Sequence, residues 1–205
     1  MIGVEAAVPR PALRRLTPLL VLTALCALPV IASWVLYLNP GLLPARGGQH
    51  GLLIDPPLAV SERGLRTSGG EPVAADALRG KWTLIWLTTE PCDRQCVTVL
   101  RRMHAMRRAL REYAAGFQSV AICLESDGQR LQAQSPPDVR VLTGSPEVLQ
   151  EFGGRLSAAA RRLPPDALYV VDPRGSAMMR YAPADDPEGI LKDLTRLLKY
   201  SRVGQ

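Results

Sequence analysis

Two cysteines four residues apart provide the most recognisable chemistry in this chain of 205 residues. Cys92 and Cys96 follow an apolar run that contains Trp86, and they stand at the start of an amphipathic segment. If both lie on one helical turn, their Cα atoms are about 6 Å apart, which a disulfide can bridge. The positive end of a helix stabilises thiolates, which are nucleophiles and ligands for soft metals. We expect a pair that alternates between dithiol and disulfide, or that holds Cu(I).

The roles of the two thiols follow from their order along the chain. Cys92 lies closest to the expected helix N-terminus and is the better candidate for the attacking thiol, so Cys96 would resolve the mixed disulfide. Asp93 opposes thiolate formation whereas Arg94 favours it, and the sequence does not fix either thiol pKa. A permanent structural disulfide is the alternative, although a bridge across one turn closes too short a loop to stabilise a fold much.

Apolar strands and amphipathic helices alternate around the cysteines. The run 81–88 is rich in β-branched and aromatic residues, as a buried strand should be. Apolar residues then recur at three- and four-residue steps from Cys96 to Tyr113, which predicts a helix ending at Gly116. This alternation indicates an α/β domain with parallel strands. Further strands are expected at 117–124, 139–142, 167–171 and 176–181, further helices from 146 and over 186–200, and an opening hairpin of 58–61 with 71–73.

Residues 17–38 carry no charge. At about 1.5 Å per residue they are long enough to cross a hydrocarbon core of roughly 30 Å, which predicts a transmembrane helix. Three arginines precede this segment, and the nearest cation after it is Arg46, so the positive-inside bias keeps the N-terminus in the cytoplasm. A cleaved signal peptide is the alternative, but the apolar stretch exceeds a usual signal core.

Four parts are expected along the chain. They are a cytoplasmic N-terminus (1–16), the transmembrane helix (17–38), a linker rich in Pro and Gly (39–57) and a globular domain (58–205). The net charge of +6 comes from scattered arginines without aromatic interleaving, which argues against nucleic-acid binding. Outside the cytoplasm thiols meet oxidising conditions, so Cys92 and Cys96 can pair while Cys123 stays buried in a strand.

Several short motifs occur in a recognisable order. They are Gly-Gly-Glu-Pro-Val at 69–73, Leu-Arg-Gly-Lys-Trp at 78–82, the Cys-x-x-x-Cys pair, Leu-Thr-Gly at 142–144 and Tyr-Val-Val-Asp-Pro-Arg-Gly at 169–175. With the anchor, they resemble the thioredoxin superfamily and, within it, the membrane-anchored Sco/SenC proteins of cytochrome c oxidase assembly. Pro-Cys-Asp-x-x-Cys and the segment 51–58 also resemble a Sco-like group associated with oxidase assembly genes. The similarity covers most of 58–200.

The resemblance implies a thioredoxin-like fold, in which helices flank a central mixed β-sheet, after one N-terminal transmembrane helix. It also implies an anchor in the bacterial inner membrane, a periplasmic C-terminal domain, and an oxidase subunit or a copper chaperone as partner. Thioredoxin folds place a cis proline against the active-site cysteines, and Pro164 and Pro165 lie near that place. Pro91 is expected to end the preceding strand.

One Sco feature is not preserved. The histidine that joins the two cysteines in binding copper falls near Pro164, and no histidine follows His104 in this chain. His104 is expected to be a surface or partly packed residue, and His50 could reach a metal only if the linker folded back. Any Cu(I) would therefore be held by Cys92 and Cys96.

The implied function is assistance to cytochrome c oxidase biogenesis by thiol–disulfide chemistry on a copper-site partner. Reducing a disulfide in that partner frees its cysteines for copper, and this requires no histidine here. Three alternatives stay open: a Cu(I) carrier that uses the two thiolates, a redox-silent assembly factor that serves as a docking surface, and a general periplasmic thiol oxidoreductase.

Overall fold

The computed structural model describes residues 12–39, 49–159 and 166–200. It divides into two compact units, Met1–Gly47 and Gly48–Gln205. Helix α1 (Ala12–Leu38) is the main element of the first unit and contains the expected span 17–38. Among the described residues it is the one helix long and apolar enough to cross a membrane, with a mean hydropathy of 2.2 over Val21–Leu38. Trp34 and Tyr37 are exposed near its end, as an interfacial position requires.

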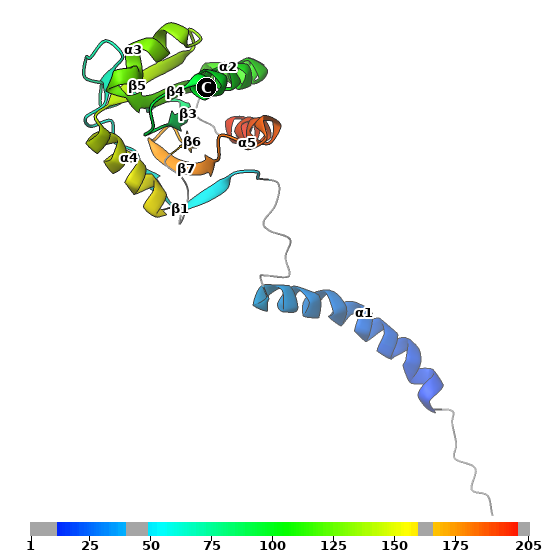
Figure 1. Cartoon of the computed structure of the whole chain (residues 1–205). Coiled ribbons are helices and arrows are strands. Elements are labelled where there is room, and N and C mark those ends of the chain that lie inside the picture. The colour runs from blue at the N-terminus through cyan, green and yellow to red at the C-terminus, as the bar shows by residue number, and fades with distance from the viewer. Residues whose placement is uncertain (1–11, 40–48, 160–165, 201–205) are drawn as a thin grey trace, which may run out of the picture. The chain divides into compact units, whose positions relative to one another are not determined.

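The second unit is built on a seven-stranded mixed sheet (Figure 1) with the strand order β1-β7-β6-β3-β4-β5-β2. The strands β3, β4 and β5 run parallel, and the other neighbours pair antiparallel. The expected mixed sheet is therefore confirmed. The strands are β1 (Leu52–Ala59), β2 (Arg66–Thr67), β3 (Trp82–Leu87), β4 (Phe117–Leu124), β5 (Val139–Gly144), β6 (Ala167–Val171) and β7 (Ser176–Tyr181).

Helices cover both faces of this sheet. Side chains alternate along β3, so Trp86 faces the core under α2 and α5, while Ile85 faces the core under α4. All six residues of β3 are buried, which explains why its sequence is almost entirely apolar. The helices are α2 (Arg94–Ala109), the 3₁₀ helix η2 (Arg111–Gly116), α3 (Glu125–Gln134), α4 (Pro146–Ala159) and α5 (Pro187–Tyr200). The expected helices from 146 and near the C-terminus are confirmed. The helix at Cys96 is also present, but its predicted end at Gly116 is wrong: α2 ends at Ala109, and the 3₁₀ helix η2 covers Arg111–Gly116.

The start of the domain differs from the predicted hairpin. Strand β1 begins at Leu52, inside the segment 39–57 that was expected to be linker, and it pairs with β7. The register of β1 shifts between Leu53 and Leu58, around two prolines that cannot donate to a ladder. The predicted pairing of 58–61 with 71–73 is wrong, since β2 pairs with β5 and only an isolated bridge closes the turn that follows β2.

A buried carboxylate fixes the beginning of β1. Asp193 of α5 is 4% exposed. Its Oδ2 accepts the backbone N–H of His50 at 2.6 Å and that of Gly51 at 3.2 Å, as well as the hydroxyl of Tyr181 at 3.0 Å. The folded unit therefore starts before residue 58, because His50 is already held by the domain.

Helix α3 was not predicted from the sequence. It follows β4 directly and buries Asp127, Gly128 and Leu131. A Cβ atom at Gly128 would collide with the side chain of Thr143 on β5. The missing side chain therefore lets α3 lie close against the sheet, and this close approach positions Asp127 beside the cysteines.

Candidate functional site

Cys92 and Cys96 meet where the chain leaves β3 and enters α2. They form a disulfide whose Cα atoms are 5.6 Å apart. Cys92 lies just outside the helix, because Asp93 is the N-cap and its Oδ1 accepts the Gln95 N–H at 2.7 Å. Cys96 lies in the first turn, where the helix dipole favours a thiolate. Each cysteine is 6% exposed, so a partner can reach only a small part of the pair.

An ion pair on α3 holds the peptide groups on both sides of Cys92. The N–H of Cys92 donates to Asp127 Oδ2 at 2.9 Å. Arg130 Nη2 donates to Asp127 Oδ1 at 2.6 Å and also to the carbonyl oxygen of Cys92. Asp127 is buried, whereas the Arg130 side chain is half exposed. We call these two side chains the Asp127–Arg130 clamp.

The third cysteine of the domain is buried in β4, as predicted. Cys123 has no exposed surface and lies in the same core cluster as Cys92 and Cys96. Its Sγ donates a weak hydrogen bond to the Leu142 carbonyl oxygen at 3.8 Å. Burial, with a further contribution from Asp127, raises the pKa of the Cys123 thiol to about 12. It is therefore a poor nucleophile.

A half-buried carboxylate, that of Asp166, lies beside Trp86 of β3. Trp86 Nε1 donates to Asp166 Oδ1 at 2.6 Å. Burial raises the pKa of Asp166, the Trp86 hydrogen bond lowers it, and the charges of Glu90 and Asp93 raise it further. Glu90 and Asp93 flank Cys92 in sequence, while the Arg130 cation is bound to the Cys92 carbonyl oxygen, so charges of both signs lie near Cys92.

The supporting prolines differ in what the structure shows. Pro91 is exposed and lies between the end of β3 and the start of α2, consistent with a residue that ends the strand. Pro164 and Pro165 lie outside the described residues. Asp166 directly follows them, and β6 begins one residue later.

Sequence reasoning missed Asp127, Arg130 and Asp166. A weak signal for Asp166 was available, because the indole of a buried strand tryptophan needs a hydrogen-bond acceptor. Asp127 and Arg130 gave no comparable signal, since they lie in a polar segment whose helix was not recognised.

Cys92 and Cys96 provide two adjacent soft donors. Within the described ranges, no three His, Cys, Asp or Glu side chains are arranged to hold a metal ion. Both histidines face carboxylates: His104 Nδ1 lies 2.6 Å from Asp138 Oδ1, and His50 Nδ1 lies 3.4 Å from Asp193 Oδ1. The two thiolates of the reduced pair fit Cu(I), which tolerates low coordination numbers.

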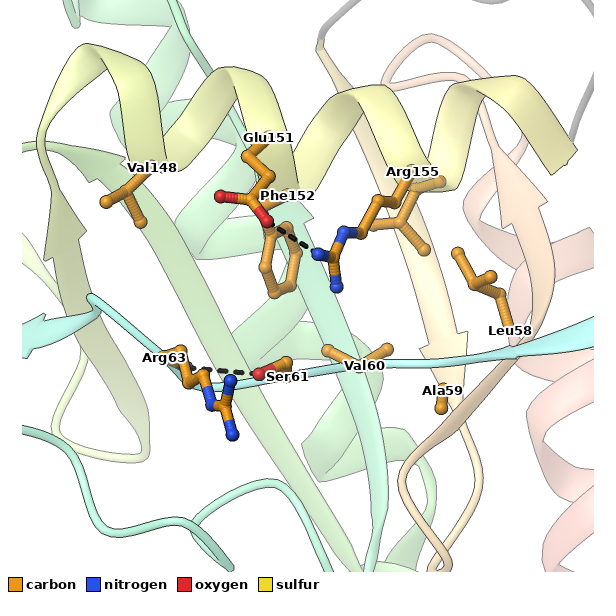
Figure 2. Close-up of a pocket in the computed structure, with 10 residues that line it drawn as sticks. Leu58, Ala59, Val60, Ser61, Arg63, Val148, Glu151, Phe152 and Arg155 are labelled. Carbon is orange, nitrogen blue, oxygen red and sulfur yellow. Dashed lines mark hydrogen bonds and ion pairs between the residues drawn. The ribbon is translucent and has the colours of Figure 1, made fainter.

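A separate hollow of about 280 Å³ lies between α4 and the segment that follows β1 (Figure 2). Phe152 of α4 points into it, and Arg63 and Arg155 lie at its edge. Phe152 and Val60 belong to the core on the α4 face, whereas both cysteines belong to the core on the opposite face. The hollow is therefore not part of the dithiol centre.

Comparison with solved structures confirms the Sco-like thioredoxin fold. Yeast Sco1 with copper bound is 16% identical, over 72% of this chain and 96% of its own, with a TM-score of 0.58. Apo Sco1 of Thermus thermophilus is 20% identical, over 75% of this chain and 99% of its own, with a TM-score of 0.55. BsSco, described as a Sco-family cytochrome c oxidase assembly protein with a disulfide switch, is 16% identical over 71% of this chain and 97% of its own, with a TM-score of 0.52.

Sequence comparison identifies the family. No curated protein sequence matches the chain. A family profile described as "transmembrane-like, thioredoxin-like, C-terminal domain" matches residues 82–201, from the start of β3 to the end of α5. Together with the apolar helix α1, this match fits a single-pass membrane anchor that carries a thioredoxin-like domain. Since the profile covers more than half of the 205 residues, the chain belongs to this transmembrane-like, thioredoxin-like family.

Proposed function

We propose that this protein assists cytochrome c oxidase biogenesis by thiol–disulfide chemistry on a copper-site partner. The observation that supports this best is the Cys92–Cys96 disulfide at the start of α2, where a reversible pair can form. BsSco, a Sco-family cytochrome c oxidase assembly protein with a disulfide switch, supports the same process and the same chemistry. The domain would act in the bacterial periplasm, anchored by α1 in the inner membrane.

The reaction begins with the reduced pair. The Cys92 thiolate attacks one sulfur of a disulfide in an oxidase subunit or a copper chaperone, and the second partner sulfur leaves as a thiolate. The Cys96 thiolate then attacks Cys92 Sγ, which releases the partner's first sulfur and closes the Cys92–Cys96 disulfide. Two electrons pass to the partner, whose two thiols can then accept Cu(I). A dithiol donor outside the cytoplasm returns the pair to its reduced form.

Direct Cu(I) carriage by the two thiolates is the second candidate. Two adjacent soft donors favour it, and the structurally similar yeast Sco1 was crystallised with copper bound. The histidine-free site favours the dithiol role, because thiol–disulfide exchange needs only the two cysteines. In this second role Cu(I) is a cargo, bound and released without electron transfer.

The decisive experiment replaces the cysteines in the full-length protein in its native membrane. With Cys92→Ser and Cys96→Ser combined, we expect oxidase activity at limiting copper to fall to that of cells lacking the protein. Cys96→Ser alone should accumulate a mixed disulfide through Cys92, whereas Cys123→Ala should preserve activity. Full oxidase activity in the double variant would contradict the dithiol role and leave a redox-silent docking factor.

A Cu(I) titration separates carriage from reduction. The reduced full-length protein in detergent micelles would compete with a chelator for Cu(I), beside the double serine variant. If the protein acts only as a reductant, it takes no Cu(I) from the chelator. One-to-one binding that is lost in the variant would establish the carrier role.

A further inference from the structure

Cys92 lies in a part of the chain that has little regular structure of its own. Strand β3 ends at Leu87, and α2 begins at Arg94, so Cys92 belongs to neither element. In the oxidised protein its bond to Cys96 fixes it to the helix. When that bond is reduced, the hydrogen bonds of the Asp127–Arg130 clamp can still hold the N–H and the carbonyl oxygen of Cys92.

The clamp residues lie on α3, which packs tightly against β5. Asp127 lies in the first turn of α3, where the helix dipole favours a carboxylate. Its neighbour Gly128 brings α3 close enough to β5 that a Cβ atom would strike Thr143. The ion pair with Arg130 at 2.6 Å compensates the buried charge of Asp127. The clamp can therefore stay in place whether or not the disulfide is formed.

We propose that Asp127 and Arg130 are positioning residues that keep Cys92 beside Cys96 after reduction of the disulfide. This inference rests on the proposed function, in which the pair alternates between dithiol and disulfide. A thiol held near its partner has a high effective concentration for closing the bond. The clamp therefore stabilises the disulfide relative to the dithiol and lowers the reduction potential of the pair.

For a substitution of Arg130, loss of positioning and loss of charge change the reduction potential of the cysteine pair in opposite directions. The Arg130 cation stabilises nearby thiolates, so loss of its charge alone would favour the disulfide and lower the reduction potential. Loss of positioning favours the dithiol and raises the potential. At Asp127 both effects raise the potential, because removal of its negative charge favours thiolates. Arg130→Ala is therefore the informative variant, and Asp127→Asn supports it.

The test measures the reduction potential of the Cys92–Cys96 pair in the full-length protein in micelles, equilibrated with glutathione redox buffers. Arg130→Ala should lower the equilibrium constant for disulfide formation about tenfold, which corresponds to a potential about 30 mV higher. The matched control is Arg155→Ala, which breaks an ion pair of the same 2.6 Å length on α4. It should leave the potential unchanged. An unchanged or lower potential in Arg130→Ala would overturn the proposal.

A second measurement needs no substitution, and so it remains valid if a clamp variant does not fold. Hydrogen exchange at the Cys92 amide can be followed by NMR in the oxidised and the reduced protein. The proposal predicts slow exchange in both forms, since Asp127 continues to accept this N–H. Exchange that becomes fast only on reduction would contradict it. Neither readout depends on oxidase assembly, so failure of the clamp and failure of the proposed function are distinguishable.

Discussion

The three cysteines of the domain share one core cluster but differ in what chemistry they can perform. Cys92 and Cys96, which follow the end of β3, keep a small exposed fraction, whereas Cys123 has none. Helix α2 favours a thiolate at Cys96, while burial and Asp127 oppose one at Cys123. A reactive pair and an inert thiol can therefore coexist in one cluster without exchange among all three sulfurs.

This difference predicts slow alkylation of Cys123. Because the pKa of Cys123 is raised from 9.0 to about 12, its thiolate fraction at pH 8.5 falls about a thousandfold. In the folded, reduced protein, iodoacetamide should label Cys123 at least a hundredfold more slowly than in guanidinium-unfolded protein, as measured by mass spectrometry of its peptide. Equal labelling rates in the two states would show that the thiol is accessible and ordinarily acidic.

Secondary-structure elements with a regular apolar pattern were predictable, and elements defined by close packing were not. Strands β3, β4 and β6 are short, mostly apolar runs, so their positions followed from the sequence. Helix α3 was not predicted, because its sequence, ESDGQRLQAQ, contains a glycine and few apolar residues. The first part of β1 was not predicted, because two adjacent prolines interrupt the strand; such prolines are tolerated at the edge of a sheet.

The same distinction applies to the candidate site. The cysteine pair was predictable, because its spacing alone places the two sulfurs within bonding reach. The clamp was not predictable, because Asp127 lies 35 positions from Cys92 in sequence and contacts it only after α3 packs on β5. Local spacing can reveal the reactive groups, whereas their supports depend on tertiary packing.

At the level of the helix, Gly128→Ala should be destabilising. Its new methyl group meets the buried, β-branched Thr143, which has little freedom to move aside. We expect a loss of about 1–3 kcal/mol in the free energy of unfolding, as for overpacked cores. Urea denaturation in micelles, followed by the fluorescence of Trp82 and Trp86, would measure it.

A matched glycine in α4 provides the control. Gly154 is exposed, and a Cβ atom there has no neighbour within 4 Å. Gly154→Ala should stabilise the protein by about 0.5–1 kcal/mol, because alanine is the better helix former. If Gly128→Ala proved equally stabilising, α3 would not be pressed against β5 as described.

On the scale of the whole molecule, we expect the charge asymmetry around α1 to decide which side of the membrane the thiols face. Arg10, Arg14 and Arg15 precede the apolar window Val21–Leu38, and the next cation in the sequence is Arg46. Positive charge near one end of a span retains that end in the cytoplasm. The domain would then lie in the periplasm, where disulfides persist and thiol exchange with envelope proteins is possible.

Reporter fusions after Gln205 test this orientation. Alkaline phosphatase, which needs disulfides, should be active there, and a green fluorescent protein exported through the same route should be dark. Replacing Arg10, Arg14 and Arg15 by alanine and adding three lysines after Asn39 should raise the fluorescence and lower the phosphatase activity, because the positive end is then reversed. A fluorescent fusion to the unaltered chain would place Cys92 and Cys96 in a reducing compartment, where a reversible pair would have to act on cytoplasmic thiols and not on an oxidase copper site.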